Sequence, residues 1–73
     1  MVMIMYKRIR ELREDNDYKQ TDLANYLNCT QVSYSRYENG QREVPIETLI
    51  KLSDFYNVSI DYILEKSDNP KRN

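Results

Sequence analysis

The sequence contains no histidine, one cysteine, one glycine and two prolines among its 73 residues. Without histidine, the chain has no His-ligated metal site and no His-based acid–base catalysis. A single cysteine excludes an internal disulfide. Strand-rich folds usually need more glycine and proline at their turns, so this composition favours helices.

Long apolar runs are also missing. The apolar segment 1–5 is short, and the basic residues Lys7 and Arg8 follow it instead of preceding it, which is the wrong order for a secretory signal peptide. No stretch approaches the ~20 apolar residues of a membrane span. We therefore expect a cytoplasmic protein that does not contact a membrane.

Chemistry-bearing motifs are scarce as well. We find no paired carboxylates in a pocket-like context, no cluster of metal ligands and no glycine-rich phosphate loop. The sequence thus predicts that the protein is not an enzyme, needs no cofactor or metal and binds no small-molecule ligand.

The charge is nearly balanced, with a formal net charge of −1. Residues 1–42 carry seven basic and six acidic side chains, whereas residues 43–73 carry four basic and six acidic ones. A broad basic field is therefore absent, and any binding to nucleic acid must depend on where individual side chains are placed.

Apolar residues recur at helical spacing along most of the chain. Met5, Ile9 and Leu12 stand at i, i+4 and i+7 and predict an amphipathic helix. Similar patterns predict an all-α fold with helices at about 5–15, 20–27, 31–38, 46–56 and 60–64. We expect one domain over residues 1–66 and a disordered polar tail over residues 67–73.

Residues suited to helix ends separate these segments. Asn28 and Gly40 tolerate the left-handed backbone that ends a helix. Thr30 and Ser59 carry hydroxyls that can cap the helix that follows each of them. Pro45 stands at the start of the fourth helix, where its missing N–H costs nothing.

The second and third expected helices are short and are separated by about three residues, as in a helix-turn-helix. Ala24 lies where such helices approach closely, and Cys29 is best explained as a small buried thiol. The strings QTDLANYLNCTQ (20–31) and YSRYENG (34–40) resemble the Cro and phage-repressor type of helix-turn-helix, also called the xenobiotic-response-element family. The resemblance covers about residues 5–65 and implies a compact, five-helix, lambda-repressor-like DNA-binding domain.

The resemblance also implies roles for individual residues, with the third helix in the major groove of double-stranded DNA. Glutamine can pair with adenine and arginine with guanine through two hydrogen bonds, and Val32 can meet a thymine methyl. The implied base contacts are Gln31, Val32, Ser33 and Arg36. The implied phosphate contacts are Gln20, Thr30, Ser35, Asn39 and Arg42, with Gln20 alternatively clamping the start of the third helix. Three of these roles have a plainer alternative. Arg36 could be a solvated side chain, Gln31 could simply extend the helix and Val32 could be exposed without function.

Two further sets of residues are expected to be structural. The family resemblance pairs Arg13 with Glu38 across the first and third helices. The tyrosines at helical spacing are better explained as core residues than as a stacking platform for single-stranded nucleic acid. Tyr34 stands where the family usually has an aliphatic residue, so its hydroxyl must reach a partner or solvent.

These features predict a sequence-specific DNA-binding regulator of transcription, with repression as the favoured role. A homodimer would double the recognised site and set half-sites ~34–36 Å apart. Tyr56, Ile60 and Tyr62 are the candidate dimer residues, although they could equally cap the core. The alternative is a protein-interaction module, either the antitoxin partner of a toxin or an adaptor, which the net negative charge favours modestly.

Overall fold

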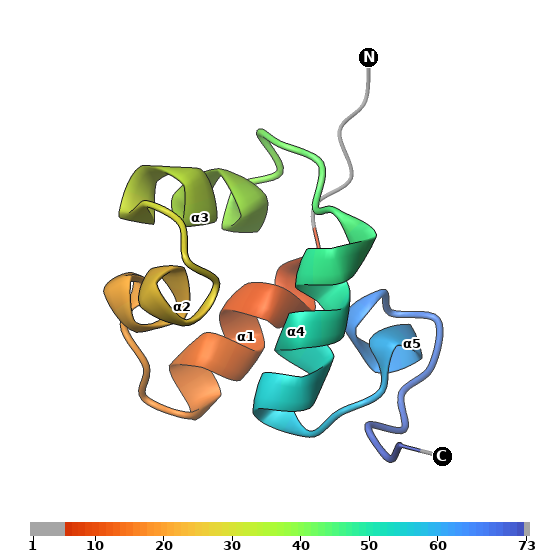
Figure 1. Cartoon of the computed structure of the whole chain (residues 1–73). Helices are drawn as coiled ribbons and strands as arrows, with labels where there is room; N and C mark the ends of the chain where they lie inside the picture. The colour runs from red at the N-terminus through yellow and green to blue at the C-terminus, as the bar shows by residue number, and fades with distance from the viewer. Residues whose placement is uncertain (1–5, 73) are drawn as a thin grey trace.

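The computed structural model describes residues 6–72, and over that range it contains five α-helices and no strand (Figure 1). The helices are α1 (Lys7–Asp15), α2 (Gln20–Tyr26), α3 (Gln31–Glu38), α4 (Ile46–Tyr56) and α5 (Ile60–Ile63). The predicted all-α, five-helix fold is confirmed. The limits of α3 and α4 are those expected, whereas α2 and α5 each end one residue earlier.

The first helix begins later than expected. Its predicted start at Met5 lies outside the described residues, and Tyr6 has an extended backbone with φ −93° and ψ 91°. Tyr6 still accepts a hydrogen bond from the Ile9 amide at 3.1 Å, as a residue flanking a helix does. The helix proper therefore starts at Lys7.

Polar side chains cap the short helices. The Thr30 hydroxyl accepts a hydrogen bond from the Ser33 amide, and the Ser59 hydroxyl accepts one from the Tyr62 amide, each at 3.1 Å. Lys19 has no such oxygen; instead the Asp22 carboxylate accepts a hydrogen bond from the Lys19 amide at 2.8 Å. Helix α2 is thus stabilised by the acidic half of a capping box, which satisfies the Lys19 amide without a side-chain oxygen at that residue.

Left-handed residues follow three of the helices, and two of them are the Asn28 and Gly40 that the sequence predicts. Asn28 follows α2 with φ 57°, Gly40 follows α3 with φ 72°, and Asn57 follows α4 with φ 54°. Glycine adopts this backbone without cost, and asparagine adopts it more readily than other residues that carry a Cβ.

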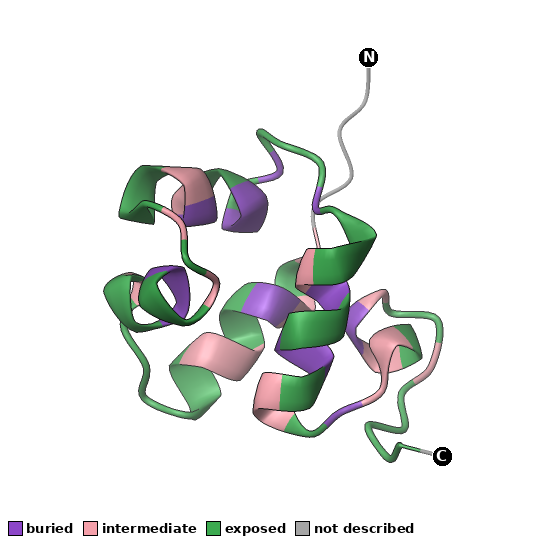
Figure 2. Ribbon diagram, in the orientation of Figure 1, coloured by how far each residue is buried: buried purple, intermediate pink, exposed green. Residues whose placement is uncertain are grey.

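The core forms where the five helices meet. Its most deeply buried apolar side chains are Ile9, Leu23, Tyr34, Leu52 and Ile63. Figure 2 shows the buried residues concentrated on the sides of the helices that face the interior. Helix α1 contacts both α3 and α5, so it links the two ends of the domain.

Arg8 joins α1 to the C-terminal end of α5. Its guanidinium donates hydrogen bonds to the backbone oxygens of Tyr62 at 2.9 Å and Ser67 at 2.7 Å, and to the Asp68 carboxylate at 2.8 Å. It also lies 4.1 Å from the centroid of the Tyr62 ring.

Residues 67–72 make other polar contacts with the domain. The Ser59 amide donates a hydrogen bond to the Pro70 oxygen at 2.9 Å, and Arg72 pairs with Asp54 at 2.7 Å. Exposed contacts of this kind are individually weak. The disorder predicted for residues 67–73 therefore stays a prediction, which hydrogen exchange can measure.

Candidate nucleic-acid interface

A tight turn joins α2 to α3 and fixes their relative position. The Cys29 amide donates a hydrogen bond to the Ala24 oxygen at 2.9 Å, and Asn28 supplies the left-handed residue between them. Ala24 is only 2% exposed, so a larger side chain would separate the two helices. Cys29 packs against the core but is only half-buried, so the predicted buried thiol is covered in part.

Helix α3 has one buried face and one exposed face. Tyr34, Tyr37 and Glu38 point inward and are buried. Gln31, Val32 and Arg36 are exposed, and Val32 retains 60% of its accessible surface. The exposed face therefore carries three of the four side chains that the sequence predicts to read bases.

The fourth, Ser33, is half-buried and belongs to the start of the helix. Its hydroxyl oxygen accepts a hydrogen bond from the Thr30 hydroxyl at 3.1 Å, while its amide donates to that same hydroxyl. Thr30 is thus occupied in capping α3. Ser33 and Thr30 lie at the edge of the exposed face, with their side chains bonded to each other.

An open hollow of about 450 Å³ lies on this face, between α2 and α3. Its lining comprises five of the predicted DNA contacts and one further residue: Gln20, Gln31, Val32, Ser35, Arg36 and Gln41. Gln41 was missed by the sequence reasoning. The only sequence signal for it is its place directly after Gly40, where the end of a helix holds the chain close to the helix surface.

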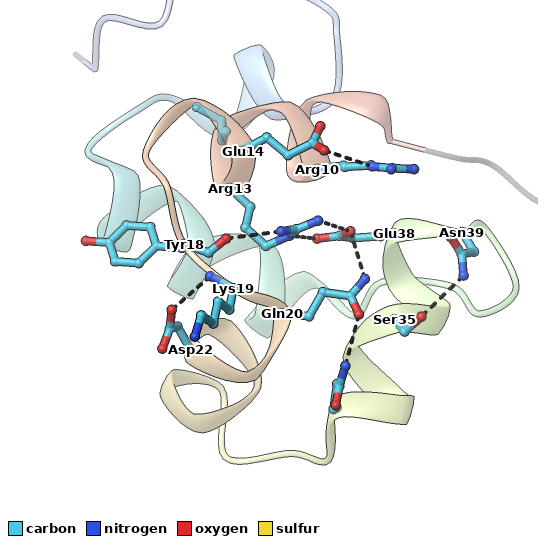
Figure 3. A network of polar contacts seen from close by, with 12 residues as sticks. Arg10, Arg13, Glu14, Tyr18, Lys19, Gln20, Asp22, Ser35, Glu38 and Asn39 are labelled. Atoms are coloured by element: carbon cyan, nitrogen blue, oxygen red, sulfur yellow. Dashed lines mark hydrogen bonds and ion pairs between the residues drawn. The ribbon is translucent and has the colours of Figure 1, made fainter.

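A network of polar side chains connects two residues of this lining, Gln20 and Gln31, to the buried Glu38 (Figure 3). Gln31 donates a long hydrogen bond to the Gln20 oxygen at 3.4 Å, and the Gln20 amide donates to Glu38 at 3.2 Å. Glu38 in turn accepts two hydrogen bonds from Arg13, at 2.7 and 3.2 Å. The structure thus brings Arg13 and Glu38 together as a bidentate ion pair. Gln20 connects this pair to Gln31 on the exposed face of α3, which we call the reading face.

Both members of this pair are charged at neutral pH. Burial alone would raise the pKa of Glu38, but the hydrogen bonds and the charge of Arg13, with the hydrogen bond from Gln20, outweigh burial and hold the pKa below its ordinary value. The hydrogen bond to Glu38 raises the pKa of Arg13. Glu38 is 1% exposed, so its carboxylate depends on these partners in place of water.

Two tyrosine hydroxyls are buried near this network. Within residues 6–72, neither Tyr34 Oη nor Tyr56 Oη has a hydrogen-bond partner of adequate geometry. Burial raises the pKa of both phenols, and the charge of Glu38 adds to that rise. The Tyr34 hydroxyl was expected to reach a partner or solvent; it is closed off from solvent, and the polar group beside it is the Glu38 carboxylate.

The remaining phosphate candidates lie at the C-terminal end of α3. The Asn39 amide donates a hydrogen bond to the Ser35 hydroxyl at 3.3 Å. Arg42 is exposed in the following loop, with its guanidinium carbon 5.6 Å from the centroid of the Tyr37 ring. Arg42 therefore supplies an exposed positive charge in the loop after α3, whereas Asn39 and Ser35 are bonded to each other.

The candidate dimer residues are each half-buried in their own domain. Tyr56 packs against the rings of Phe55 and Tyr18, with centroids 5.0 and 6.4 Å away. Tyr62 is covered on one side by Arg8, and Ile60 packs against the core. The large apolar side chains with the most exposure are instead Tyr18, Tyr26, Val32, Ile46 and Ile50.

Some kinds of site are absent from the described part of the chain. Residues 6–72 contain no group of three cysteine, aspartate or glutamate side chains that could hold a metal ion. They also form no helix that is both long and apolar enough to cross a membrane.

Two short helices packed through a tight turn, with the outer face of the second one exposed, define a helix-turn-helix DNA-binding domain. Residues 9–63 match the family model described as helix-turn-helix. The chain belongs to the XRE/Cro-type helix-turn-helix family of transcriptional regulators, as the sequence resemblance predicted. It is accordingly a DNA-binding transcriptional regulator of the helix-turn-helix type.

Named relatives support this assignment. The chain is 41% identical over 71 residues to the HTH-type transcriptional regulator ImmR of Bacillus subtilis, covering 97% of this chain and 56% of ImmR. It is 34% identical over 61 residues to the cryptic phage CTXphi transcriptional repressor RstR of Vibrio cholerae, covering 84% of this chain and 55% of RstR. The chain thus spans about half the length of these curated relatives.

Proposed function

We propose that this chain reads a specific duplex sequence through the exposed face of α3, and that it represses transcription by occupying that sequence. The observation that carries the proposal is the hollow in which Gln31, Val32 and Arg36 meet. These side chains offer amide, apolar and guanidinium groups to the base edges of a major groove.

The polar network beneath the hollow gives Gln31 and Gln20 separate roles in this proposal. Gln20 is held by Glu38, and its oxygen accepts from Gln31, so Gln20 acts as a clamp on the first residue of α3. Gln31 keeps its own carbonyl oxygen and a second N–H for an adenine edge. The hydrogen bond between Gln31 Nε2 and Gln20 Oε1 is 3.4 Å long and therefore weak, so the two side chains can adjust their positions as DNA binds.

Repression is the regulatory role that the relatives favour. RstR is named a phage transcriptional repressor, and ImmR a transcriptional regulator. A domain that occupies DNA at or near a promoter can repress by excluding other proteins from the same site. We expect the protein to do this in the cytoplasm, where it meets duplex DNA.

We further propose that two copies bind one operator. A single α3 contacts only a few base pairs, and a two-fold dimer would place two such helices ~34–36 Å apart along one side of the duplex. Tyr56, Ile60 and Tyr62 remain the proposed contacts between the copies. Sedimentation as a monomer both with and without operator DNA would rule the dimer out.

The experiment that tests base reading is selection of binders from a random pool of duplex DNA. The wild-type protein should enrich a two-fold symmetric motif, and Arg36→Ala and Gln31→Ala should each abolish preference at definite positions. Lys66→Ala is the matched control, because Lys66 is exposed beyond α5 and its loss removes the same single charge as the loss of Arg36. Enrichment that survives both reading-face variants would refute the proposal.

A second candidate function is binding of a protein partner, such as a toxin or an adaptor. The net charge of −1 favours this function, because a protein with a net negative charge has no overall electrostatic attraction to the phosphates of DNA. If no sequence is enriched and binding is undetectable at ~50 mM salt, where phosphate contacts are strongest, the partner hypothesis takes precedence. Co-purification of a small protein with the tagged chain would then support it.

A further inference from the structure

Gln41 lies outside the two helices of the helix-turn-helix motif, yet it lines the same hollow as Gln31 and Arg36. We propose that Gln41 is a further specificity-determining residue, which contacts a base edge next to the base that Arg36 reads. The inference rests on the proposed function and adds to it one residue and one base pair of the operator.

The backbone holds Gln41 firmly at the end of α3. Gly40 adopts a left-handed backbone with φ 72°, and its amide donates a hydrogen bond to the Tyr37 oxygen at 3.4 Å. The Gln41 amide then donates to the Arg36 oxygen at 3.0 Å. This pair of hydrogen bonds closes the helix in a Schellman-type end. Gln41 is therefore bonded through its backbone to Arg36 and keeps a fixed position relative to it.

The side chain of Gln41 keeps its hydrogen-bonding groups available. The amides of Gln20 and Asn39 donate to Glu38 and Ser35. In contrast, the Gln41 side chain is exposed and makes no hydrogen bond to any residue of the described range 6–72. Both its N–H donors and its oxygen are thus free, which is the combination that pairs with N7 and N6 of adenine.

A base contact fits Gln41 better than a phosphate contact does. Its neighbour Arg42 carries the positive charge that a phosphate attracts, and Arg42 is absent from the lining of the hollow. Gln41 is uncharged, so it releases no counterion from DNA. It shares the hollow with Gln31, Val32 and Arg36, which the proposed function assigns to base edges.

The test compares wild type with Gln41→Ala on the selected operator and on all of its single-base-pair variants. We expect Gln41→Ala to lower the preference at one base pair by at least about fivefold, and to leave the preferences at other positions unchanged. That base pair should neighbour the one at which Arg36→Ala loses preference. The melting temperature should stay that of wild type, because the side chain is exposed.

Arg42→Ala is the contrasting variant from the same loop. It should weaken binding to every operator variant alike. The slope of log binding constant against log salt concentration should fall by about 1, as expected for the loss of one phosphate contact. Gln41→Ala should leave the salt dependence unchanged.

Three results would overturn the inference. Preferences identical to wild type would show that Gln41 does not touch the DNA, and a uniform loss across all variants would make it a backbone contact. If the wild-type protein selects no sequence at all, the proposed function fails and the inference falls with it. That last result is seen before any variant is made, so the two failures are distinguishable.

Discussion

Glu38 is a charged side chain buried in a small core, at 1% exposure. Arg13 and Gln20 hold it with three hydrogen bonds, and Gln20 also contacts the first residue of the reading helix. A 73-residue domain has only ~4–11 kcal/mol of stability in total, so one unpaired buried charge is a large fraction of it. The Glu38 carboxylate therefore affects both the stability of the domain and, through Gln20, the position of Gln31.

Removing the partner of this carboxylate should be costly. We expect Arg13→Met to lose about 3 kcal/mol of unfolding free energy, because it leaves Glu38 buried without its counter-charge. Chemical denaturation monitored by circular dichroism measures the loss. The matched control is Glu14→Gln, which breaks the exposed Arg10–Glu14 pair and should change stability by less than about 0.5 kcal/mol. Equal losses of unfolding free energy in the two variants would mean that the buried pair contributes no more to stability than the exposed pair.

The same carboxylate predicts how stability depends on acidity. The folded-state pKa of Glu38 lies below its ordinary value of 4.5, so the unfolded chain takes up a proton first as the pH falls. The contribution of Glu38 is thus fully present above about pH 4.5 and is lost as the pH falls toward the lower folded-state pKa. Unfolding free energies measured across this range should fall less steeply for Glu38→Gln than for wild type. A Glu14→Gln control that flattened the curve as much would assign the effect to carboxylates in general.

At the scale of helices, the sequence predicts the elements well where their ends carry explicit signals. Helix α3 lies between Thr30, whose hydroxyl caps it, and Gly40, whose left-handed backbone closes it, so both of its limits could be predicted. The start of α1 could not, because Tyr6 has no capping side chain and nothing in its chemistry marks it as extended.

Other features of the reading face depend on contacts that no local pattern encodes. Gln41 joins the hollow only because the end of α3 folds back onto the helix, and Gln20 meets Glu38 only when α1, α2 and α3 pack together. Residue chemistry likewise predicts a partner for every buried hydroxyl, yet within residues 6–72 Tyr34 Oη has no hydrogen bond of adequate geometry. The sequence thus names candidate DNA contacts, which stay a prediction, but it does not show how these side chains are held.

The end of α3 offers a test of this element as a unit. Gly40→Ala places a Cβ on a buried residue with φ 72°, and we expect a loss of about 1 kcal/mol in unfolding free energy. Because the Gln41 amide is bonded to Arg36 through this turn, DNA binding should weaken as well. The converse substitution, Asn57→Gly at φ 54°, removes a Cβ from a left-handed residue at the end of α4 and should be neutral or stabilising. A Gly40→Ala protein with the unfolding free energy and DNA affinity of wild type would show that the turn tolerates a side chain.

At the scale of the whole molecule, the DNA-reading and C-terminal ends of the domain meet through α1. Its Arg13 reaches α3, while its Arg8 reaches the end of α5. The half-buried Arg8 side chain, 17% exposed, touches the α5 carbonyl and the Tyr62 ring, whereas its partner Asp68 is 99% exposed. These unequal exposures imply that the ion pair with Asp68 adds little, and that Arg8 acts chiefly through the backbone oxygens of Tyr62 and Ser67 and the Tyr62 ring.

Amide hydrogen exchange separates the two contributions. We expect Asp68→Ala to leave the melting temperature and the protection of the Leu64 and Lys66 amides at the end of α5 unchanged, because an exposed ion pair is screened by solvent. Arg8→Ala should lower both, since it removes the hydrogen bond to the Tyr62 oxygen and the contact with its ring. If Asp68→Ala reduces protection as much as Arg8→Ala does, residues 67–72 are an ordered part of the domain and the predicted disordered tail is wrong. If the amides of residues 67–72 exchange freely in wild type while α5 stays protected, the domain ends near residue 66 and Arg8 closes it there.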